Sequence, residues 1–276
     1  MPTRLVVFTD LDGSLLDARS YSFAAAREAL GALRASGAPL VLVSSKTRAE
    51  IESIRYRLEH RHPFVVENGG AVVIPTGYFG GPVAGAAYRG PYQVIELGVS
   101  YERLRSALRE IAKALGCPLR GFGDMAVGEI ASRTGLSLAD AALAKQREYD
   151  EPFVVEGRAA PLKEIGKQAE ARGLRCTRGG RFFHLTGDGD KGRACRLLID
   201  AYRRLAPGGD RLVTAGIGDS LNDLPMLAVV DRPVLVRRPD GSYDPEASLP
   251  NLLRAPGIGP AGWNQAVRQL LLQKWG

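Results

Sequence analysis

The sequence predicts an α/β fold with a doubly wound parallel sheet and a second, α+β module inserted into it. Short apolar, β-prone segments alternate with amphipathic helical segments at both ends of the 276-residue chain, and this alternation is typical of a parallel sheet covered by helices. Between about residues 85 and 186 the alternation is lost, which indicates an insertion. We therefore expect a core of residues 1–84 and 187–276, an inserted module of residues 85–186, and ligands at the carboxyl ends of the parallel strands.

The first part of the chain predicts a β-α-β-α-β order. Apolar runs without polar interruption predict buried strands, and apolar residues at helical spacing predict the helices between them. Gly37 is expected to end the first helix. The expected elements are strands at residues 5–9, 40–43 and 64–66, and helices at about 22–35 and 48–58.

The inserted region begins after a stretch at residues 75–91 that is rich in Gly, Pro, Ala and aromatic residues and has no clear period. A Gly-rich turn is expected at residues 121–123. The expected helices lie at about residues 101–115, 137–145 and 161–172, and the expected strands at about 92–97, 153–155, 174–177 and 181–186. This mixture predicts an α+β module.

The doubly wound pattern returns in the last third of the chain. The segment Asp190-Lys191-Gly192 is expected to open a helix, and Pro225 to stand in the first turn of another. The remaining expected elements are strands at residues 212–217 and 233–236 and a terminal helix at 263–275.

The segment Asp10-Leu11-Asp12-Gly13-Ser14 follows the first predicted strand. Residues two apart in a strand share a face, so both carboxylates can converge where the strand ends. Two such carboxylates suit a hard cation such as Mg²⁺, and an Asp can also form an aspartyl-phosphate. The alternative is an ordinary acidic turn, because Asp-Gly is a common turn dipeptide. This segment alone leaves both interpretations open.

Further polar groups follow other predicted strands or begin predicted helices. They are Ser44 and Ser45, Lys191, and Asp219 with Asp223. Phosphoryl transfer needs an oxygen nucleophile, a cation for the nonbridging oxygens, and donors that hold the phosphoryl group in line. Taken singly, these residues are more typical of a surface lysine or of helix caps; their common order along the chain favours the chemistry.

Composition excludes few function classes. The net charge is +7, from 37 Lys and Arg against 30 Asp and Glu. The cations are spread along the chain without a basic tail, which favours dispersed surface charge over nucleic-acid binding. Three scattered cysteines and no apolar run long enough to cross a bilayer lead us to expect a cytoplasmic chain without a leader. We expect no nucleic-acid or membrane partner, and a monomer or homodimer.

The chain resembles the haloacid dehalogenase superfamily of aspartate-nucleophile phosphatases. The matching segments are Asp10-Leu11-Asp12-Gly13-Ser14, Val43-Ser44-Ser45, Asp190-Lys191-Gly192 and Gly218-Asp219-Ser220-Leu221-Asn222-Asp223. A long insertion after the third strand is similar to the subgroup with a large α/β cap, and Glu67-Asn68-Gly69-Gly70 fits that subgroup. The resemblance implies a Rossmann-type core with a cap that selects the substrate.

The resemblance also implies catalytic roles. Asp10 attacks phosphorus and becomes the phosphoaspartate, and Asp12 protonates the leaving oxygen and then activates the hydrolytic water. Ser45 or Ser44, together with Lys191, holds the phosphoryl group. Alignment with the subgroup's usual small-Thr-Gly-Arg turn selects Ser45.

A cofactor follows from the same resemblance. It implies Mg²⁺ held by Asp10, the main-chain carbonyl of Asp12 and Asp219, with Asp223 in support. Lys46 stands where the subgroup usually has Gly, and this departure suggests a part in substrate recognition.

Several segments resemble the mannosyl-3-phosphoglycerate phosphatase family more narrowly. They are Ser44-Ser45-Lys46-Thr47-Arg48-Ala49-Glu50, Glu67-Asn68-Gly69-Gly70-Ala71, Gly121-Phe122-Gly123-Asp124-Met125, Gln146-Arg147-Glu148-Tyr149 and Gly179-Gly180-Arg181-Phe182-Phe183-His184. The resemblance implies a substrate with a phosphate and a carboxylate on a glyceryl unit, joined to a sugar.

Cationic and polar residues near these segments are candidates for binding that substrate. Lys46, Arg147 and Arg181 suit the carboxylate, since Arg matches it with two parallel hydrogen bonds. The candidates for the sugar and the rest of the substrate are Glu67, Asn68, Gln146, Asp188, Ser220 and Asn222, with the His184 region. The structural alternative for each is a surface salt bridge or cap-core packing. Rival functions are a broad-specificity sugar-phosphate phosphatase, a phosphomannomutase-like phosphotransferase and a non-catalytic binding module.

Overall fold

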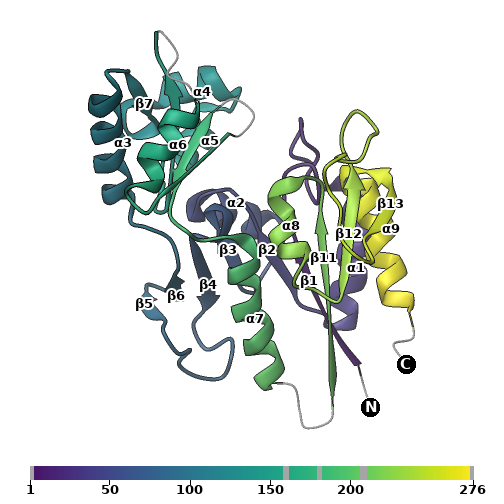
Figure 1. Cartoon of the computed structure of the whole chain (residues 1–276). Helices are drawn as coiled ribbons and strands as arrows, with labels where there is room; N and C mark the ends of the chain where they lie inside the picture. Colours follow the sequence, from purple (N-terminus) through teal and green to yellow (C-terminus); the bar gives the residue numbers. More distant parts are fainter. Residues whose placement is uncertain (1–2, 158–161, 179–181, 206–209, 274–276) are drawn as a thin grey trace. The chain divides into compact units, whose positions relative to one another are not determined.

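The computed structural model describes residues 3–157, 162–178, 182–205 and 210–273 (Figure 1). The chain divides into two compact units. Unit 1 contains the described residues of Met1–Ser44, His60–Ile95 and Asp190–Gly276, and unit 2 contains those of Ser45–Glu59 and Glu96–Gly189. The division predicted from the sequence, with an inserted module at residues 85–186, stays a prediction.

Unit 1 is built on a nine-stranded sheet with the order β13-β12-β11-β1-β2-β3-β4-β6-β5. Its strands are β1 (Thr3–Thr9), β2 (Leu40–Val43), β3 (Phe64–Val66), β4 (Ala71–Pro75), β5 (Ala87–Arg89), β6 (Tyr92–Glu96), β11 (Arg211–Gly218), β12 (Arg232–Arg237) and β13 (Leu253–Ile258). The strands from β13 to β3 pair in parallel, which confirms the predicted doubly wound sheet. Two hairpin-like pairs, β3 with β4 and β5 with β6, are antiparallel.

The order of the strands reverses between β1 and β11. From β1 the chain proceeds to β2 and β3 on one side, and β11 to β13 extend on the other. Thr9 at the end of β1 lies opposite Ile217 of β11. Open α/β sheets bind ligands outside the carboxyl ends of the strands at such a switch point. The topology therefore places a candidate site next to Asp10 and Asp219.

Helices cover both faces of this sheet. Helices α7 (Lys191–Leu205) and α8 (Leu224–Leu227) lie on one face, and α1 (Arg27–Ser36) and α9 (Gly259–Leu272) on the other (Figure 1). Short 3-10 turns, η1 (Ala24–Ala26) and η4 (Leu221–Asp223), precede α1 and α8. Helix α1 buries Leu30 and Leu33 and ends at Gly37, as predicted, with φ +69°.

Unit 2 contains a four-stranded antiparallel sheet with the order β7-β8-β10-β9. Its strands are β7 (Leu119–Gly121), β8 (Asp150–Val155), β9 (Arg175–Arg178) and β10 (Phe183–Thr186). Its helices are α2 (Arg48–Arg57), α3 (Tyr101–Leu115), α4 (Val127–Thr134), α5 (Leu138–Ala144) and α6 (Leu162–Glu170), with the 3-10 turn η3 (Phe122–Asp124). Leu104, Leu108, Phe153 and Ile165 pack in its buried core.

Most expected elements are present, with a few additions. Helix α4 and strands β4, β5, β7 and β13 were not expected from the sequence pattern. The predicted terminal helix begins earlier than expected, at Gly259, and its predicted end at Trp275 lies outside the described residues. No helix in the described part of the chain is both long enough and apolar enough to cross a membrane.

Candidate functional site

The turn after β1 is fixed by its own main chain. Asp10 is nearly buried, and its N–H donates to the Ile217 carbonyl at 2.9 Å. Leu11 is fully buried, and its carbonyl accepts from the N–H groups of Ser14 at 3.2 Å and Leu16 at 2.8 Å. The buried leucine separates the two acidic residues, so its main-chain hydrogen bonds fix the turn that carries Asp10 and Asp12.

Gly13 brings this turn close to the end of β11. Its φ of +79° is a left-handed conformation that glycine adopts readily. A Cβ at this position would lie 2.7 Å from Asp219 Oδ2. Glycine is therefore required both by the backbone conformation and by the carboxylate of Asp219 beside it.

Lys191 links the first and last acidic segments. It is the first residue of α7, as predicted, and its side chain is 1% exposed. Its Nζ donates to Asp10 Oδ1 at 2.8 Å and to Asp223 Oδ1 at 2.7 Å. A single buried ammonium group thus bridges two carboxylates that are 213 residues apart in the chain, from position 10 to position 223.

Asp223 is held mainly by main-chain donors. Its Oδ2 accepts from the N–H groups of Asp219 at 3.0 Å and Ser220 at 3.2 Å, and from the Ser220 hydroxyl at 3.4 Å. The Ser220 hydroxyl also lies 2.6 Å from Asn222 Oδ1. Ser220 and Asn222 therefore shape the turn after β11.

Burial and crowding perturb the titration of this cluster. Burial raises the pKa of Asp10, and the negative charges of Asp223, Asp12 and Asp219 add to it against the opposing effect of Lys191. Burial, followed by Asp223, raises the pKa of Asp219 to about 7. Burial alone would lower the pKa of Lys191, but Asp10 and Asp223 outweigh it and raise that pKa. The site therefore concentrates more negative charge than one lysine neutralises.

The same carboxylates fit a divalent cation. One oxygen from each of Asp10, Asp219 and Asp223 lies within 4.8 Å of the other two. Oxygen-only donors of this kind suit Mg²⁺, which uses one or two carboxylates and keeps several waters. The side chain of Asp12 is not in this group, and the sequence resemblance implies only a main-chain contribution from it.

Ser44 follows β2 and is tied to the loop after β3. It is 1% exposed, its N–H donates to the Val65 carbonyl at 3.1 Å, and its carbonyl accepts from the Asn68 N–H at 2.9 Å. Glu67 and Asn68 have φ values of +47° and +55°, which are unusual for residues other than glycine. Glu67 is 2% exposed, so both predicted substrate residues lie in a strained and largely buried loop.

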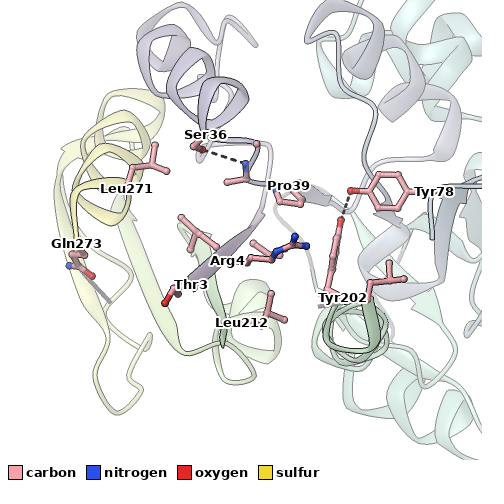
Figure 2. Close-up of a pocket in the computed structure, with 14 residues that line it drawn as sticks. Thr3, Arg4, Ser36, Pro39, Tyr78, Tyr202, Leu212, Leu271 and Gln273 are labelled. Atoms are coloured by element: carbon pink, nitrogen blue, oxygen red, sulfur yellow. Dashed lines mark hydrogen bonds between the residues drawn. The ribbon is translucent and has the colours of Figure 1, made fainter. Parts of the chain in front are cut away.

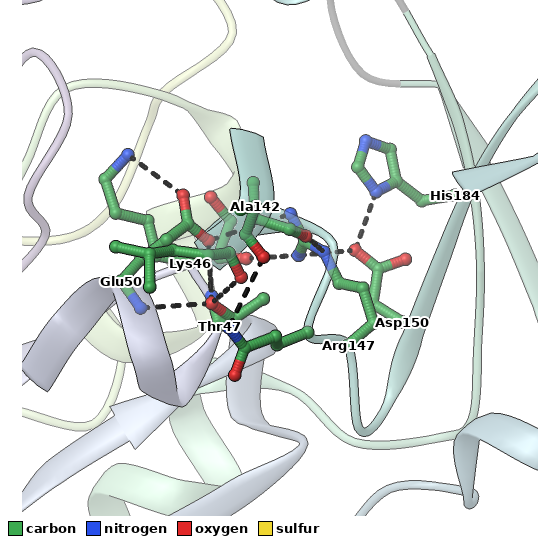
Figure 3. A network of polar contacts seen from close by, with 11 residues as sticks. Lys46, Thr47, Glu50, Ala142, Arg147, Asp150 and His184 are labelled. Carbon is green, nitrogen blue, oxygen red and sulfur yellow. Dashed lines mark hydrogen bonds and ion pairs between the residues drawn. The ribbon is translucent and has the colours of Figure 1, made fainter. Parts of the chain in front are cut away.

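Unit 2 brings three other predicted residues together around the start of α2: Ser45, Lys46 and Arg147. Figure 3 shows Lys46 and Arg147 in this network. The Ser45 carbonyl accepts from Arg147 Nη1 at 3.0 Å, and Lys46 Nζ lies 3.9 Å from Glu50 Oε1. Gln146 is less involved: its side chain donates to the Ala142 carbonyl at 3.4 Å on an exposed surface. The structure therefore assembles the turn at residues 45–47 with the segment after α5.

Two predicted substrate residues are not part of this assembly. The side chain of Asp188 is 79% exposed, and it pairs with Arg175 at 3.1 Å. Arg181 lies outside the described residues.

Asp10 is also supported by two residues that the sequence did not indicate, Thr9 and Trp263. The Thr9 hydroxyl donates to the Asp10 carbonyl at 2.7 Å and accepts from the Trp263 indole N–H at 2.9 Å. Trp263 is fully buried in α9. A hydroxyl directly before Asp10 is a weak sequence signal for Thr9, whereas nothing in the local pattern connects Trp263 with a site 254 residues away.

A cavity of about 660 Å³ lies at the amino ends of the parallel strands, away from the carboxyl ends that carry Asp10 and Asp219 (Figure 2). It is lined by residues at the start of β1, among them Thr3 and Arg4, and by Pro39 before β2. Tyr78 and Tyr202 are hydrogen-bonded there through their hydroxyls at 2.9 Å. Its described lining residues include no carboxylate, so this cavity is not the candidate site.

Comparison with known sequences indicates one family. Residues 7–78 match the model of the haloacid dehalogenase-like hydrolases. A protein of Methanococcoides burtonii called glucosyl-3-phosphoglycerate/mannosyl-3-phosphoglycerate phosphatase is 46% identical over 266 residues, which cover 96% of this chain and 97% of that protein. A mannosyl-3-phosphoglycerate phosphatase of Pyrococcus furiosus is 39% identical over 231 residues, covering 84% and 90%.

Solved structures show the same fold. A phosphatase of the haloalkanoate enzyme superfamily from Bacteroides thetaiotaomicron matches with a TM-score of 0.65 and 16% identity, covering 97% of this chain and 94% of that one. A protein of Thermoplasma acidophilum matches with a TM-score of 0.65 and 19% identity, covering 99% and 100%. At these identities the likeness concerns the fold.

Proposed function

This chain belongs to the haloacid dehalogenase-like hydrolases, in the family of the glucosyl-3-phosphoglycerate and mannosyl-3-phosphoglycerate phosphatases, and from that premise we propose that it is a Mg²⁺-dependent phosphatase acting on mannosyl-3-phosphoglycerate. The products are mannosylglycerate, a compatible solute, and inorganic phosphate. The observation that carries the reaction class is the buried cluster at the strand switch point, where Lys191 bridges Asp10 and Asp223 beside Asp219.

The proposed reaction has two displacements at phosphorus. A carboxylate oxygen of Asp10 attacks, the bond between phosphorus and the C3 oxygen of the glycerate breaks, and the carboxyl group of Asp12 protonates that oxygen. Asp12 then removes a proton from a water molecule that attacks the phosphoaspartate. Phosphate leaves, and both side chains return to their starting states.

The other core residues hold and neutralise the phosphoryl group. Lys191 lies 2.8 Å from the attacking carboxylate, so its charge acts where the transferred group arrives. Mg²⁺ would be held by Asp10, Asp219 and the main-chain carbonyl of Asp12, with Asp223 in support. When bound, the cation neutralises phosphate oxygens and the crowded carboxylates. Ser45, or Ser44, donates to the phosphoryl oxygens.

The substrate assignment rests on the relatives. Two of them carry names that include both the glucosyl and the mannosyl compound, and these sugars differ only in the configuration at C2. We therefore propose that the glucosyl compound is a second substrate. The other candidate substrate contacts stay predictions. They are Lys46, Glu67, Asn68, Gln146, Arg181, Asp188, Ser220 and Asn222.

A panel of phosphate esters tests this function through the phosphate that is released. It consists of mannosyl-3-phosphoglycerate, glucosyl-3-phosphoglycerate, 3-phosphoglycerate, mannose 1-phosphate and mannose 6-phosphate, each with and without Mg²⁺. We expect kcat/KM to be highest for the two glycosyl compounds and activity to disappear with a chelator. Equal activity on the simple sugar phosphates would contradict the narrow substrate and favour a broad-specificity phosphatase. Conversion of mannose 1-phosphate to mannose 6-phosphate would indicate a mutase.

The cellular setting is a further part of the proposal. The three cysteines, Cys117, Cys176 and Cys195, are free thiols, and this supports a reducing cytoplasm. A small anionic substrate is the expected partner, and a monomer or homodimer the expected assembly.

A further inference from the structure

We propose that Arg147 is a positioning residue for the phosphoryl-binding turn at Ser45, and not a ligand of the substrate carboxylate. The inference rests on the proposed function, because it concerns how the same reaction is supported. It also revises the role that the sequence suggested for Arg147. Three features carry it: the partners of the guanidinium, the buried acid behind it, and the geometry of the peptide that it holds.

The guanidinium of Arg147 is engaged by protein atoms on several sides (Figure 3). Its Nε donates to the Ala144 carbonyl at 2.9 Å, and its Nη1 donates to the Ser45 carbonyl at 3.0 Å. The Phe122 ring centre lies 5.8 Å from its Cζ, within range of a cation–π contact. The side chain is only 9% exposed. Nη1 also lies 3.5 Å from Asp150 Oδ2, and Nη2 lies 4.0 Å from Glu50 Oε2. A substrate carboxylate, which would need two parallel N–H groups, would therefore compete with two acids of the protein for the remaining donors.

A buried acid fixes the guanidinium from behind. Asp150 is fully buried at the start of β8, and its Oδ2 lies 3.5 Å from Arg147 Nη1. The same oxygen is hydrogen-bonded to His184 Nδ1 at 2.8 Å. A carboxylate is removed from water only where its charge is compensated. Of these two partners, the guanidinium is the one that is always charged, and we infer that Asp150 is the counter-ion that orients Arg147.

The other side of the turn is fixed by Glu50, whose Oε2 also lies 4.0 Å from Arg147 Nη2. Glu50 Oε2 accepts from the Thr47 N–H at 2.8 Å, and Glu50 N–H donates to the Thr47 hydroxyl at 3.1 Å, which together form a capping box. The Thr47 hydroxyl also lies 3.0 Å from the Leu143 carbonyl. Thr47 is thus immobilised, and the peptide between Ser45 and Lys46 is held from its other side by Arg147.

The bond to the Ser45 carbonyl determines where the next N–H group points. The described backbone contains no cis peptide bond, and in a planar trans peptide the C=O and N–H groups point in opposite directions. By holding the Ser45 carbonyl, Arg147 therefore directs the Lys46 N–H away from itself. In the proposed reaction this N–H and the Ser45 hydroxyl are adjacent donors for the phosphoryl oxygens. Arg147 acts on that pair through the peptide, without touching the substrate.

Replacement of Arg147 by Lys separates this role from carboxylate binding. Lysine keeps the charge but cannot reach two acceptors in the planar arrangement of a guanidinium. We compare mannosyl-3-phosphoglycerate with p-nitrophenyl phosphate, which has no carboxylate, and measure the inhibition constant of inorganic phosphate. We expect kcat/KM to fall by about 10- to 100-fold on both substrates, with their ratio within about threefold of wild type, and phosphate to inhibit less tightly.

Two further variants secure the test. Asp150→Asn keeps Arg147 but removes its counter-ion. We expect kcat/KM to fall by a similar factor on both substrates, and by less than in Arg147→Lys. Arg133→Gln removes an exposed arginine of unit 2 that pairs with Glu129 at 3.0 Å, and serves as the matched control with unchanged kinetics. Thermal unfolding of each variant shows that it is folded, and Asp150→Asn supplies the result if Arg147→Lys is not.

The opposite pattern would overturn the proposal. A loss at least tenfold larger on mannosyl-3-phosphoglycerate than on p-nitrophenyl phosphate, with unchanged inhibition by phosphate, would make Arg147 a carboxylate ligand. Unchanged kinetics on both substrates would remove any positioning role. Wild-type protein that hydrolyses neither ester would contradict the proposed function itself, and this outcome is read before any variant is compared.

Discussion

At the scale of single residues, the candidate site depends on one buried lysine. Lys191 is 1% exposed and contacts a carboxylate on each side, at 2.8 and 2.7 Å. Buried charges of this kind are tolerated only as a set, because removal of one member leaves the others without compensation. Lys191 is therefore a structural residue as well as a proposed catalytic one.

Replacement of Lys191 by Ala should lower the stability of the protein as well as its activity. Because Asp10 and Asp223 would remain buried without their cation, we expect a loss of about 3–5 kcal/mol in the free energy of unfolding, measured by urea titration with tryptophan fluorescence. Lys167→Ala is the control, because that lysine is 68% exposed in its pair with Glu164. Its replacement should lower the free energy of unfolding by less than about 1 kcal/mol. An equal loss of unfolding free energy in Lys191→Ala and Lys167→Ala would contradict the structural role of Lys191.

Some residues of the site are predictable and others are not. Asp10, Lys191 and Asp219 follow strands or begin a helix, so their convergence follows from the parallel sheet alone. The contact of Trp263 with Thr9 depends on how α9 packs, which no local pattern encodes. The bond from Arg147 to Ser45 joins residues 102 apart; the charge of Arg147 was visible, but its partner was not.

At the scale of elements, the turn after β1 and the end of β11 form one structural feature. Gly13 allows the turn to pass beside Asp219, where a methyl group would lie 2.7 Å from Oδ2. The position of Asp219 is therefore set by a residue that has no functional group of its own.

Gly13→Ala should weaken metal activation more than it weakens the fold. We expect the Mg²⁺ concentration for half-maximal phosphate release to rise about tenfold or more, because the new methyl group displaces Asp219. Gly37→Ala is the matched control: its φ is also positive, at +69°, but nothing lies within 4 Å of the added Cβ. In both variants the free energy of unfolding should fall by about 1–2 kcal/mol, because alanine disfavours a positive φ. A similar Mg²⁺ requirement in the two variants would contradict the proposed role of Gly13.

The unexpected elements have local physical causes. Strand β4 returns antiparallel through a loop in which Glu67 and Asn68 adopt positive φ, and a pattern of residue types does not reveal such a turn. Strand β13 includes Pro256 and Gly257, which argue against a strand except at the edge of a sheet, where β13 lies. Helix α4 has only eight residues and begins with Val and Gly. Uninterrupted apolar runs, by contrast, predicted β1 and β2 closely, and apolar residues at helical spacing predicted α3.

At the scale of the whole molecule, we expect that the positive net charge is surface charge and does not lead to nucleic-acid binding. Although the net charge is +7, many arginines have acidic partners, such as Arg105 with Asp124 and Glu151, and Arg120 with Glu129. We expect no measurable binding to a fluorescent DNA duplex at physiological ionic strength, by anisotropy. Binding that weakens steeply with added salt would contradict this expectation.

The central claim of the proposed function is that Asp10, at the strand switch point of unit 1, is the nucleophile. Everything proposed about substrate and positioning presupposes that Asp10 is the attacking group.

The most direct measurement is therefore the rate of phosphate release from mannosyl-3-phosphoglycerate by Asp10→Asn, compared with Asp200→Asn. Asp200 is an exposed residue of α7 that pairs only loosely with Arg203, at 3.5 Å. The account predicts that Asp10→Asn remains folded by thermal unfolding and releases phosphate at the background rate, while Asp200→Asn matches wild type. Sustained turnover by folded Asp10→Asn would contradict the claim that Asp10 is the nucleophile.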